Sequence, residues 1–134
     1  MTRALTVHGL LERKARSHPS RVALADDTRR LDYATWWRKS RYLAALLQRS
    51  GVNQGHLVGV LCGKSVMLPV SFTAISMLGA RFVALNPRWP EAERKRVFSR
   101  WPDRALLAEG DFETSSWQTE RVLQLSYPDL ESGD

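Results

Sequence analysis

The clearest pattern in the sequence is Leu57-Val-Gly-Val-Leu-Cys62, an apolar run followed by Gly63-Lys-Ser65 and a mostly apolar segment that reaches Gly79. A continuous apolar run of this length predicts a strand that is covered on both faces. We expect a helix over residues 65–78, because Ser65 can cap its start and Gly79 can end it. Arg81-Phe-Val-Ala-Leu85 repeats the apolar run and predicts a second buried strand.

The same alternation continues toward the C-terminus. Asn86-Pro-Arg-Trp-Pro90 predicts a turn, and Pro90 suits the first position of a helix that we expect to end near Arg100. Arg104-Ala-Leu-Leu-Ala108 predicts a third strand. Strands and helices that alternate with short links indicate an α/β fold: a parallel sheet with right-handed crossovers and helices on both faces, in three layers.

A helix and a hairpin precede this unit. Thr6 can cap a helix over residues 7–17, which Pro19 stops. Residues 21–25 and 29–33 predict the strands of a β-hairpin around the turn Asp26-Asp-Thr28. A long helix over residues 34–50 follows, and Gly51 ends it.

The charge pattern and the element pattern change near the same position. Residues 1–104 carry 19 Lys and Arg against 7 Asp and Glu, whereas residues 105–134 carry Arg121 against 7 acids. We expect a packed unit over residues 1–108 and an acidic, poorly patterned tail over residues 109–134, in which residues 121–125 can add one edge strand. Because the basic residues are spread over many segments, we favour a solvated basic surface over a nucleic-acid footprint.

Length and composition exclude several classes of protein. The 134 residues are 43% hydrophobic and 25% charged, which is typical of one globular domain and not of a disordered or fibrous chain. Cys62 is the only cysteine, so an internal disulfide is excluded. No apolar run approaches the length of a membrane span, and the N-terminus shows no signal-peptide pattern. We therefore expect a cytoplasmic protein.

The residue types that carry chemistry form no recognisable site. Gly63-Lys-Ser65 resembles the end of a phosphate loop, but Val58 stands where that loop needs its first glycine, so we expect an ordinary strand-to-helix turn. Cys62 fits a small core residue better than a nucleophile. The histidines His8, His18 and His56 lie in three separate segments without ligand spacing, so the sequence predicts no metal site. The paired carboxylates lie in a turn, Asp26 and Asp27, and at a helix start, Glu91 and Glu93, so the sequence predicts no acid–base pair.

The pair Trp36-Trp37 has a ligand-binding and a packing interpretation. A base-stacking platform or a ligand cage would use both rings. Adjacent residues on a helix point about 100° apart, so we expect one ring to face the core and the other to cover the helix flank.

Several segments together resemble a known family. Leu31-Asp-Tyr-Ala-Thr-Trp36 resembles the first core motif of the adenylate-forming (AMP-binding) enzymes, and Leu78-Gly-Ala-Arg-Phe-Val-Ala-Leu-Asn-Pro87 resembles the second. A glycine- and valine-containing segment, residues 51–60, lies between them at the family's spacing. The resemblance covers residues 5–108 and departs from the family at Thr35 and at Gly79-Ala80.

The resemblance implies the reaction that a full-length family member catalyses, and it favours one branch of the family. Family members activate a carboxylate with ATP, release pyrophosphate and transfer the acyl group to a thiol, so ATP, Mg²⁺ and CoA are implied for a full-length enzyme. Asn86-Pro87 resembles the acyl-CoA synthetase branch, with o-succinylbenzoate–CoA ligases as the narrower comparison. Peptide-synthetase adenylation domains favour Asp-Pro at this position.

The family's phosphate loop, adenine motif, ribose motif and catalytic lysine do not occur in this sequence. No catalytic, cofactor-binding or metal-binding residue is therefore carried over. The matching positions imply structural roles, with Tyr33 at a helix start and Gly79 at a helix end. We expect this chain to resemble the N-terminal subdomain, truncated before the phosphate loop, and to be inactive alone.

Three roles remain open at this point. The first is a scaffold that self-associates or meets a complementing protein chain, because a patch that a full-length enzyme would cover is then exposed. The second is a relative reused as a protein-interaction or regulatory module. Nucleic-acid binding through the basic body is the third and weakest, and we expect no membrane partner.

Overall fold

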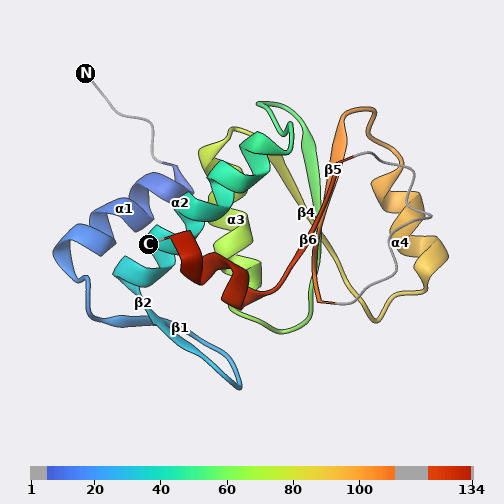
Figure 1. Ribbon diagram of the computed structural model, residues 1–134. Helices are drawn as coiled ribbons and strands as arrows, with labels where there is room; N and C mark the ends of the chain where they lie inside the picture. The colour runs from blue at the N-terminus through green and yellow to red at the C-terminus, as the bar shows by residue number, and fades with distance from the viewer. Residues whose placement is uncertain (1–5, 111–120, 134) are drawn as a thin grey trace.

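The computed structural model describes residues 6–110 and 121–133 (Figure 1). The N-terminal elements are a helix, a hairpin and a long helix: α1 (Val7–Ser17), β1 (Val22–Ala25), β2 (Arg30–Asp32) and α2 (Tyr33–Arg49). Alternating strands and helices follow: β3 (Leu57–Leu61), α3 (Met67–Met77), β4 (Arg81–Leu85), α4 (Glu91–Phe98) and β5 (Arg104–Glu109). The last elements are β6 (Val122–Leu125) and the 3-10 helix η1 (Tyr127–Gly133).

The expected three-layer α/β fold is confirmed. The four-stranded sheet has the order β4-β3-β5-β6, and each pair of neighbours is parallel, with Leu57 opposite both Arg81 and Arg104. Helices α2 and α3 lie on one face of the sheet and α4 lies on the other (Figure 1). The hairpin of β1 and β2 forms a separate antiparallel sheet.

Residues of β3 face two hydrophobic cores, one on each side of the sheet. Val58 and Val60 face the larger core beneath α2 and α3, whereas Leu57 and Leu61 face a smaller one beneath α4. Gly59 faces α4 as well, and a Cβ there would lie 2.8 Å from a Leu85 methyl carbon and from the Phe98 ring. A side chain at position 59 would therefore push α4 away from the sheet.

Caps set the ends of the two helices that carry the family motifs. Asp32 accepts a hydrogen bond from the Thr35 N–H at 2.7 Å, so α2 begins at Tyr33, one residue before the expected start. Gly79 follows α3 with a φ of +67°, a conformation that favours glycine. These positions confirm that Tyr33 and Gly79 mark a helix start and a helix end.

The structure corrects the prediction for residues 81–85. We expected a strand buried on both faces, but β4 lies at the edge of the sheet, and Arg81 and Ala84 are exposed. Only Leu85 of this strand is fully buried. An apolar run alone does not distinguish an edge strand from a central one, because both faces of each are partly covered by helices.

The C-terminal residues that the structure describes are more regular than the expected tail. The predicted edge strand is present as β6, which pairs with β5 from Leu106 opposite Val122 onward. Tyr127 and Leu130 of η1 are buried against α2 in the larger core. Across residues 6–110 and 121–133, no helix combines the length and the hydropathy that crossing a bilayer requires.

Candidate functional site

The topology points to the carboxyl ends of β3 and β5. The chain leaves β3 for β4 on one side and later crosses to β5 on the other, with α3 and α4 on opposite faces (Figure 1). In open α/β sheets, ligands bind where the strand order reverses in this way. Four polar or nucleophilic residues meet there, and we call them the carboxyl-end cluster: Asp26, Cys62, Ser65 and Glu109.

Asp26 links the hairpin to the start of α3. One carboxylate oxygen accepts hydrogen bonds from the N–H groups of Thr28 and Arg29, at 2.8 and 2.7 Å. The other accepts the Val66 N–H at 2.8 Å. The Val66 bond, followed by the bond from Thr28, lowers the pKa of Asp26 to about 2. The turn at residues 26–28 therefore carries a fixed negative charge.

Glu109 closes the other side of the cluster. The Ser65 hydroxyl donates a hydrogen bond to its carboxylate at 3.1 Å. Burial raises the pKa of Glu109, while the Ser65 bond and the charge of Arg29 act in the opposite direction. Burial, and then the nearby Glu109 charge, raise the pKa of the Cys62 thiol to about 12. Cys62 is therefore a neutral thiol at physiological pH, which fits the core role expected for it.

The cluster does not fit the phosphates of a nucleotide. The Val66 N–H is taken by Asp26, and the Met67 N–H donates to the Ser65 hydroxyl at 3.0 Å. An anion at the start of α3 would meet two carboxylates in place of free N–H donors. The Gly63-Lys-Ser65 turn connects β3 to α3, and these hydrogen bonds are consistent with the ordinary strand-to-helix turn expected from the incomplete motif.

The histidines are distributed as the sequence predicted. His8 shares a hydrogen bond of 2.9 Å with Ser76, His18 contacts Ser17, and the His56 ring accepts the Asn53 N–H. Within the described ranges, no group of three His, Cys, Asp or Glu residues has the arrangement of a metal site.

Trp36 joins two helices. Its indole N–H donates to the Thr73 hydroxyl at 3.1 Å and approaches the Pro69 carbonyl at 3.3 Å, and its ring stacks on Tyr33. Trp36 and Trp37 are both half-buried, and Trp36 packs against the larger core. The packing interpretation of the pair agrees with this arrangement.

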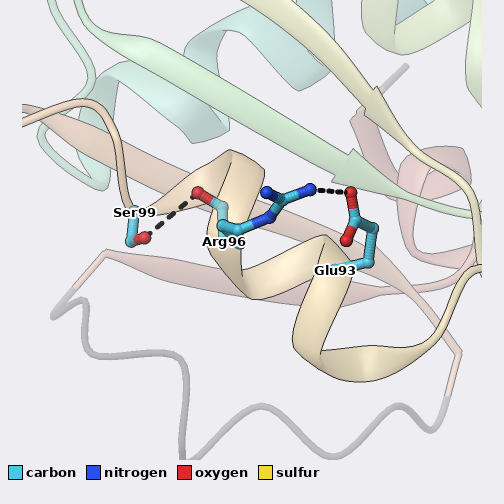
Figure 2. A network of polar contacts seen from close by, with 3 residues as sticks. All are labelled: Glu93, Arg96 and Ser99. Atoms are coloured by element: carbon cyan, nitrogen blue, oxygen red, sulfur yellow. Dashed lines mark hydrogen bonds and ion pairs between the residues drawn. The ribbon is translucent and has the colours of Figure 1, made fainter.

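Two ion pairs lie within α4. Figure 2 shows the Glu93 carboxylate accepting a hydrogen bond from the Arg96 guanidinium one helical turn away. The Ser99 hydroxyl donates a hydrogen bond to the Arg96 carbonyl. Lys95 pairs with Glu91 at 3.0 Å. Exposed pairs of this kind contribute about 0.3–0.5 kcal/mol each and mark a solvated helix face.

Sequence reasoning missed one buried cation. Lys39 lies in α2 and is 3% exposed; its ammonium donates to the Leu130 carbonyl at 2.8 Å and lies 5.9 Å from the Tyr127 ring centroid. The Arg29 guanidinium lies over the same ring at 4.4 Å. Position 39 adjoins Ser40 and Leu43 on the buried side of α2, which was the available signal.

The sheet order, the crossovers on both faces and the crevice at the strand ends define a doubly wound α/β domain. Its family follows from comparison with known proteins. The chain belongs to the AMP-binding enzyme family, whose model matches residues 11–130.

The relatives are much longer proteins. A nonribosomal peptide synthetase of Gibberella zeae is 40% identical over 86 residues, which cover 64% of this chain and 1% of that protein. A component of the mycosubtilin synthase of Bacillus subtilis is 26% identical over 132 residues, covering 98% and 5%. The N-terminal subdomain of Klebsiella oxytoca NpsA superposes with a TM-score of 0.78 at 27% identity, covering 96% of this chain and 33% of that one.

The comparisons confirm the family and the similarity to an N-terminal subdomain. The chain spans at most a twentieth of these two synthetases and a third of the solved NpsA chain. These relatives support a likeness to the adenylation domains of peptide synthetases, and they do not support the acyl-CoA synthetase branch that Asn86-Pro87 favoured.

Proposed function

We propose that this chain is a scaffold within an adenylate-forming unit and does not itself activate a carboxylate. Adenylation needs donors held around the developing charge on phosphate and carboxylate. At the carboxyl end of the described sheet, those donors are already satisfied by Asp26 and Ser65, and Glu109 adds a second carboxylate. The closed start of α3 is the observation that carries this proposal.

The proposed unit needs a second set of residues for its chemistry. ATP, Mg²⁺ and a thiol such as CoA would bind those residues, and we expect self-association or a complementing chain to bring them to this scaffold. The open β4 edge supports this expectation, because unpaired strand edges favour pairing with another chain. We expect the unit in the cytoplasm, where ATP and reduced thiols are supplied.

Two activity measurements test the inactive role. The purified chain is titrated with ATP–Mg²⁺ by calorimetry and assayed for pyrophosphate exchange with a mixture of carboxylic acids. We expect no binding heat and no exchange. Exchange that is lost in the Ser65→Ala variant would contradict the proposal, because it would place chemistry at the carboxyl-end cluster.

A chimera tests the scaffold role directly. The matching residues of Klebsiella oxytoca NpsA are replaced by this chain, and we expect the chimera to retain pyrophosphate exchange within about tenfold of NpsA, since the scaffold supplies no reacting group. A matched chimera with Leu47→Asp, which places a charge in the larger core, should lose folding and activity together. A folded but inactive first chimera would contradict the scaffold role.

A further inference from the structure

The α3 side of the β4 edge carries two adjoining hollows. One, of about 470 Å³, lies at the carboxyl ends of β3 and β4 and includes Lys64, Ala84 and Arg88 in its lining. The other, of about 410 Å³, is lined only by apolar side chains: Leu68, Pro69, Phe72 and Phe82. Leu68 lines both, so the two form one groove along β4, which we call the β4 groove.

The apolar part of the β4 groove is exposed and fixed in shape. Phe72 of α3 and Phe82 of β4 form an edge-to-face pair with ring centroids 5.1 Å apart, and Phe72 is 41% exposed. Phe82 and Ala84 lie two residues apart, so both point to the α3 side of the strand. An apolar side chain from a neighbouring strand would pack against the exposed face of these rings.

The other end of the groove is cationic. The Lys64 ammonium and the Arg88 guanidinium have no acidic partner among the described residues, and no acid lines this hollow. A third hollow, which shares Lys64 and Leu68 with this one, is lined by Asp26 and Asp27, so Arg88 is the principal cation of the β4 groove.

The loop that carries Arg88 is held in place. The Arg88 N–H donates to the Asn86 side chain at 2.9 Å, and the Arg94 guanidinium donates to the carbonyls of Pro87 and Trp89 at 2.7 Å. These bonds position the Arg88 backbone before any partner arrives, which lowers the entropy lost on binding.

The main chain of β4 completes the recognition surface. Arg81–Leu85 pairs with β3 on one side, and on its other side the structure describes no strand. An edge with unpaired N–H and C=O groups can accept an extended segment as an added strand. Pockets beside such an edge then select the side chains of the added segment.

We infer that the β4 groove binds an extended segment of a partner protein, which adds as a strand beside β4, places apolar side chains against Phe72 and Phe82, and sets an acidic side chain beside Arg88 and Lys64. The three features are complementary to one ligand chemistry, an acidic and apolar strand. This inference rests on the proposed scaffold role, in which a second polypeptide completes the unit, and it names the surface where that polypeptide binds.

A synthetic peptide tests the inference without an activity assay. The probe is acetyl-Glu-Thr-Val-Thr-Phe-Thr-Glu-amide, whose acidic ends place a carboxylate near Arg88 in either strand direction. We expect calorimetric binding to the full chain at peptide concentrations up to about 1 mM. The matched peptide with Lys in place of Glu should bind at least about tenfold more weakly. A peptide N-methylated at alternate amides should lose binding, because it cannot pair with β4.

Variants locate the binding surface. Arg88→Gln should weaken binding of the acidic peptide by about fivefold with unchanged thermal unfolding. Phe72→Ser should weaken it by about tenfold in a chain that remains folded. Leu10→Ser is the matched control, because Leu10 is a similarly exposed apolar residue on α1. No binding of the acidic peptide, or equal binding of the N-methylated peptide, would overturn the inference. The NpsA chimera remains a separate test, so the inference can fail while the scaffold role holds.

Discussion

The two edge strands of the sheet, β6 and β4, differ in what the chain packs beyond them. Beyond β6, the 3-10 helix η1 packs back on α2, where Lys39 holds the Leu130 carbonyl and Leu130 is fully buried. Beyond β4, the described chain places nothing, and Phe72 and Ala84 are exposed. The segment after β6 is therefore packed into the larger core, whereas the β4 edge is exposed, and we call these the closed and the open edge, although β6 too has no further strand beside it in the described chain. Stability should concentrate at the closed edge and association at the open one.

The largest difference between the edges should be seen in core truncations. Leu130→Ala removes a fully buried side chain and should lower the free energy of unfolding by about 2–4 kcal/mol. Phe82→Ala at the open edge should cost about 1 kcal/mol, because its side chain is only half-buried. Urea denaturation of the two variants measures the difference. Equal losses would show that the β4 edge is covered in solution.

The buried ammonium should be the next largest contribution at the closed edge. Lys39→Ala leaves the Leu130 carbonyl without its donor and should lower the free energy of unfolding by about 2–3 kcal/mol. Arg41→Ala, two residues away on the exposed side of α2, is the control and should change stability by less than about 0.5 kcal/mol. A Lys39 variant as stable as the Arg41 variant would rule out a structural role for the contact.

The carboxyl-end cluster should give the stability of the fold a pH dependence. Binding to Val66 and Thr28 holds the pKa of Asp26 at about 2, below its usual 3.8, so its contribution is present above pH 3.8 and is lost as the pH falls toward 2. Asp26→Asn should flatten the acid limb of a plot of unfolding free energy against pH. An unchanged acid limb would show that the hairpin turn does not hold α3.

Glu109 should act with the opposite sign. Burial raises its pKa in the folded state, so the stability linked to its protonated form is present at acid pH and decreases as the pH rises through the folded pKa. Glu109→Gln should therefore lose less stability than the parent between acid and neutral pH. The same titration of unfolding free energy measures this, and a steeper decline in the variant would contradict it.

The smallest effect on stability is expected at the open edge itself. Ala84→Lys places a charge on the exposed side of β4, so it should suppress concentration-dependent association while changing stability by less than about 0.5 kcal/mol. Sedimentation at several concentrations measures association. Val22→Lys, at an exposed apolar position of β1, is the control and should leave association unchanged. Equal suppression by both variants would indicate a general charge effect.

The sequence predicted most elements because their signals are local. The alternation from Leu57 to Ala108 predicted the layers and the parallel sheet, and the cap at Thr6 predicted the start of α1, because both signals depend on neighbours only a few residues apart. The exposure of β4 was not predictable in this way. It depends on the order of strands in the sheet, which an apolar run does not encode.

The contacts that close the candidate site and the far edge were not predictable either. Asp26 reaches Val66 across 40 positions, Ser65 reaches Glu109 across 44, and Lys39 reaches Leu130 across 91. Local patterns placed Asp26 in a turn and left Lys39 unassigned. Only the folded chain shows that one carboxylate blocks a helix start and that one lysine is buried.

The Lys39–Leu130 contact also bears on how the chain folds during synthesis. A ribosome makes Lys39 before Leu130, which lies 91 positions further along the chain, so one acceptor of this buried ammonium is missing until Leu130 has emerged. The larger core remains incomplete until Tyr127 and Leu130 are released. Folding of this unit is therefore completed only after residues 127–130 have left the ribosome, and before that stage the buried side of α2 lacks the apolar side chains of Tyr127 and Leu130.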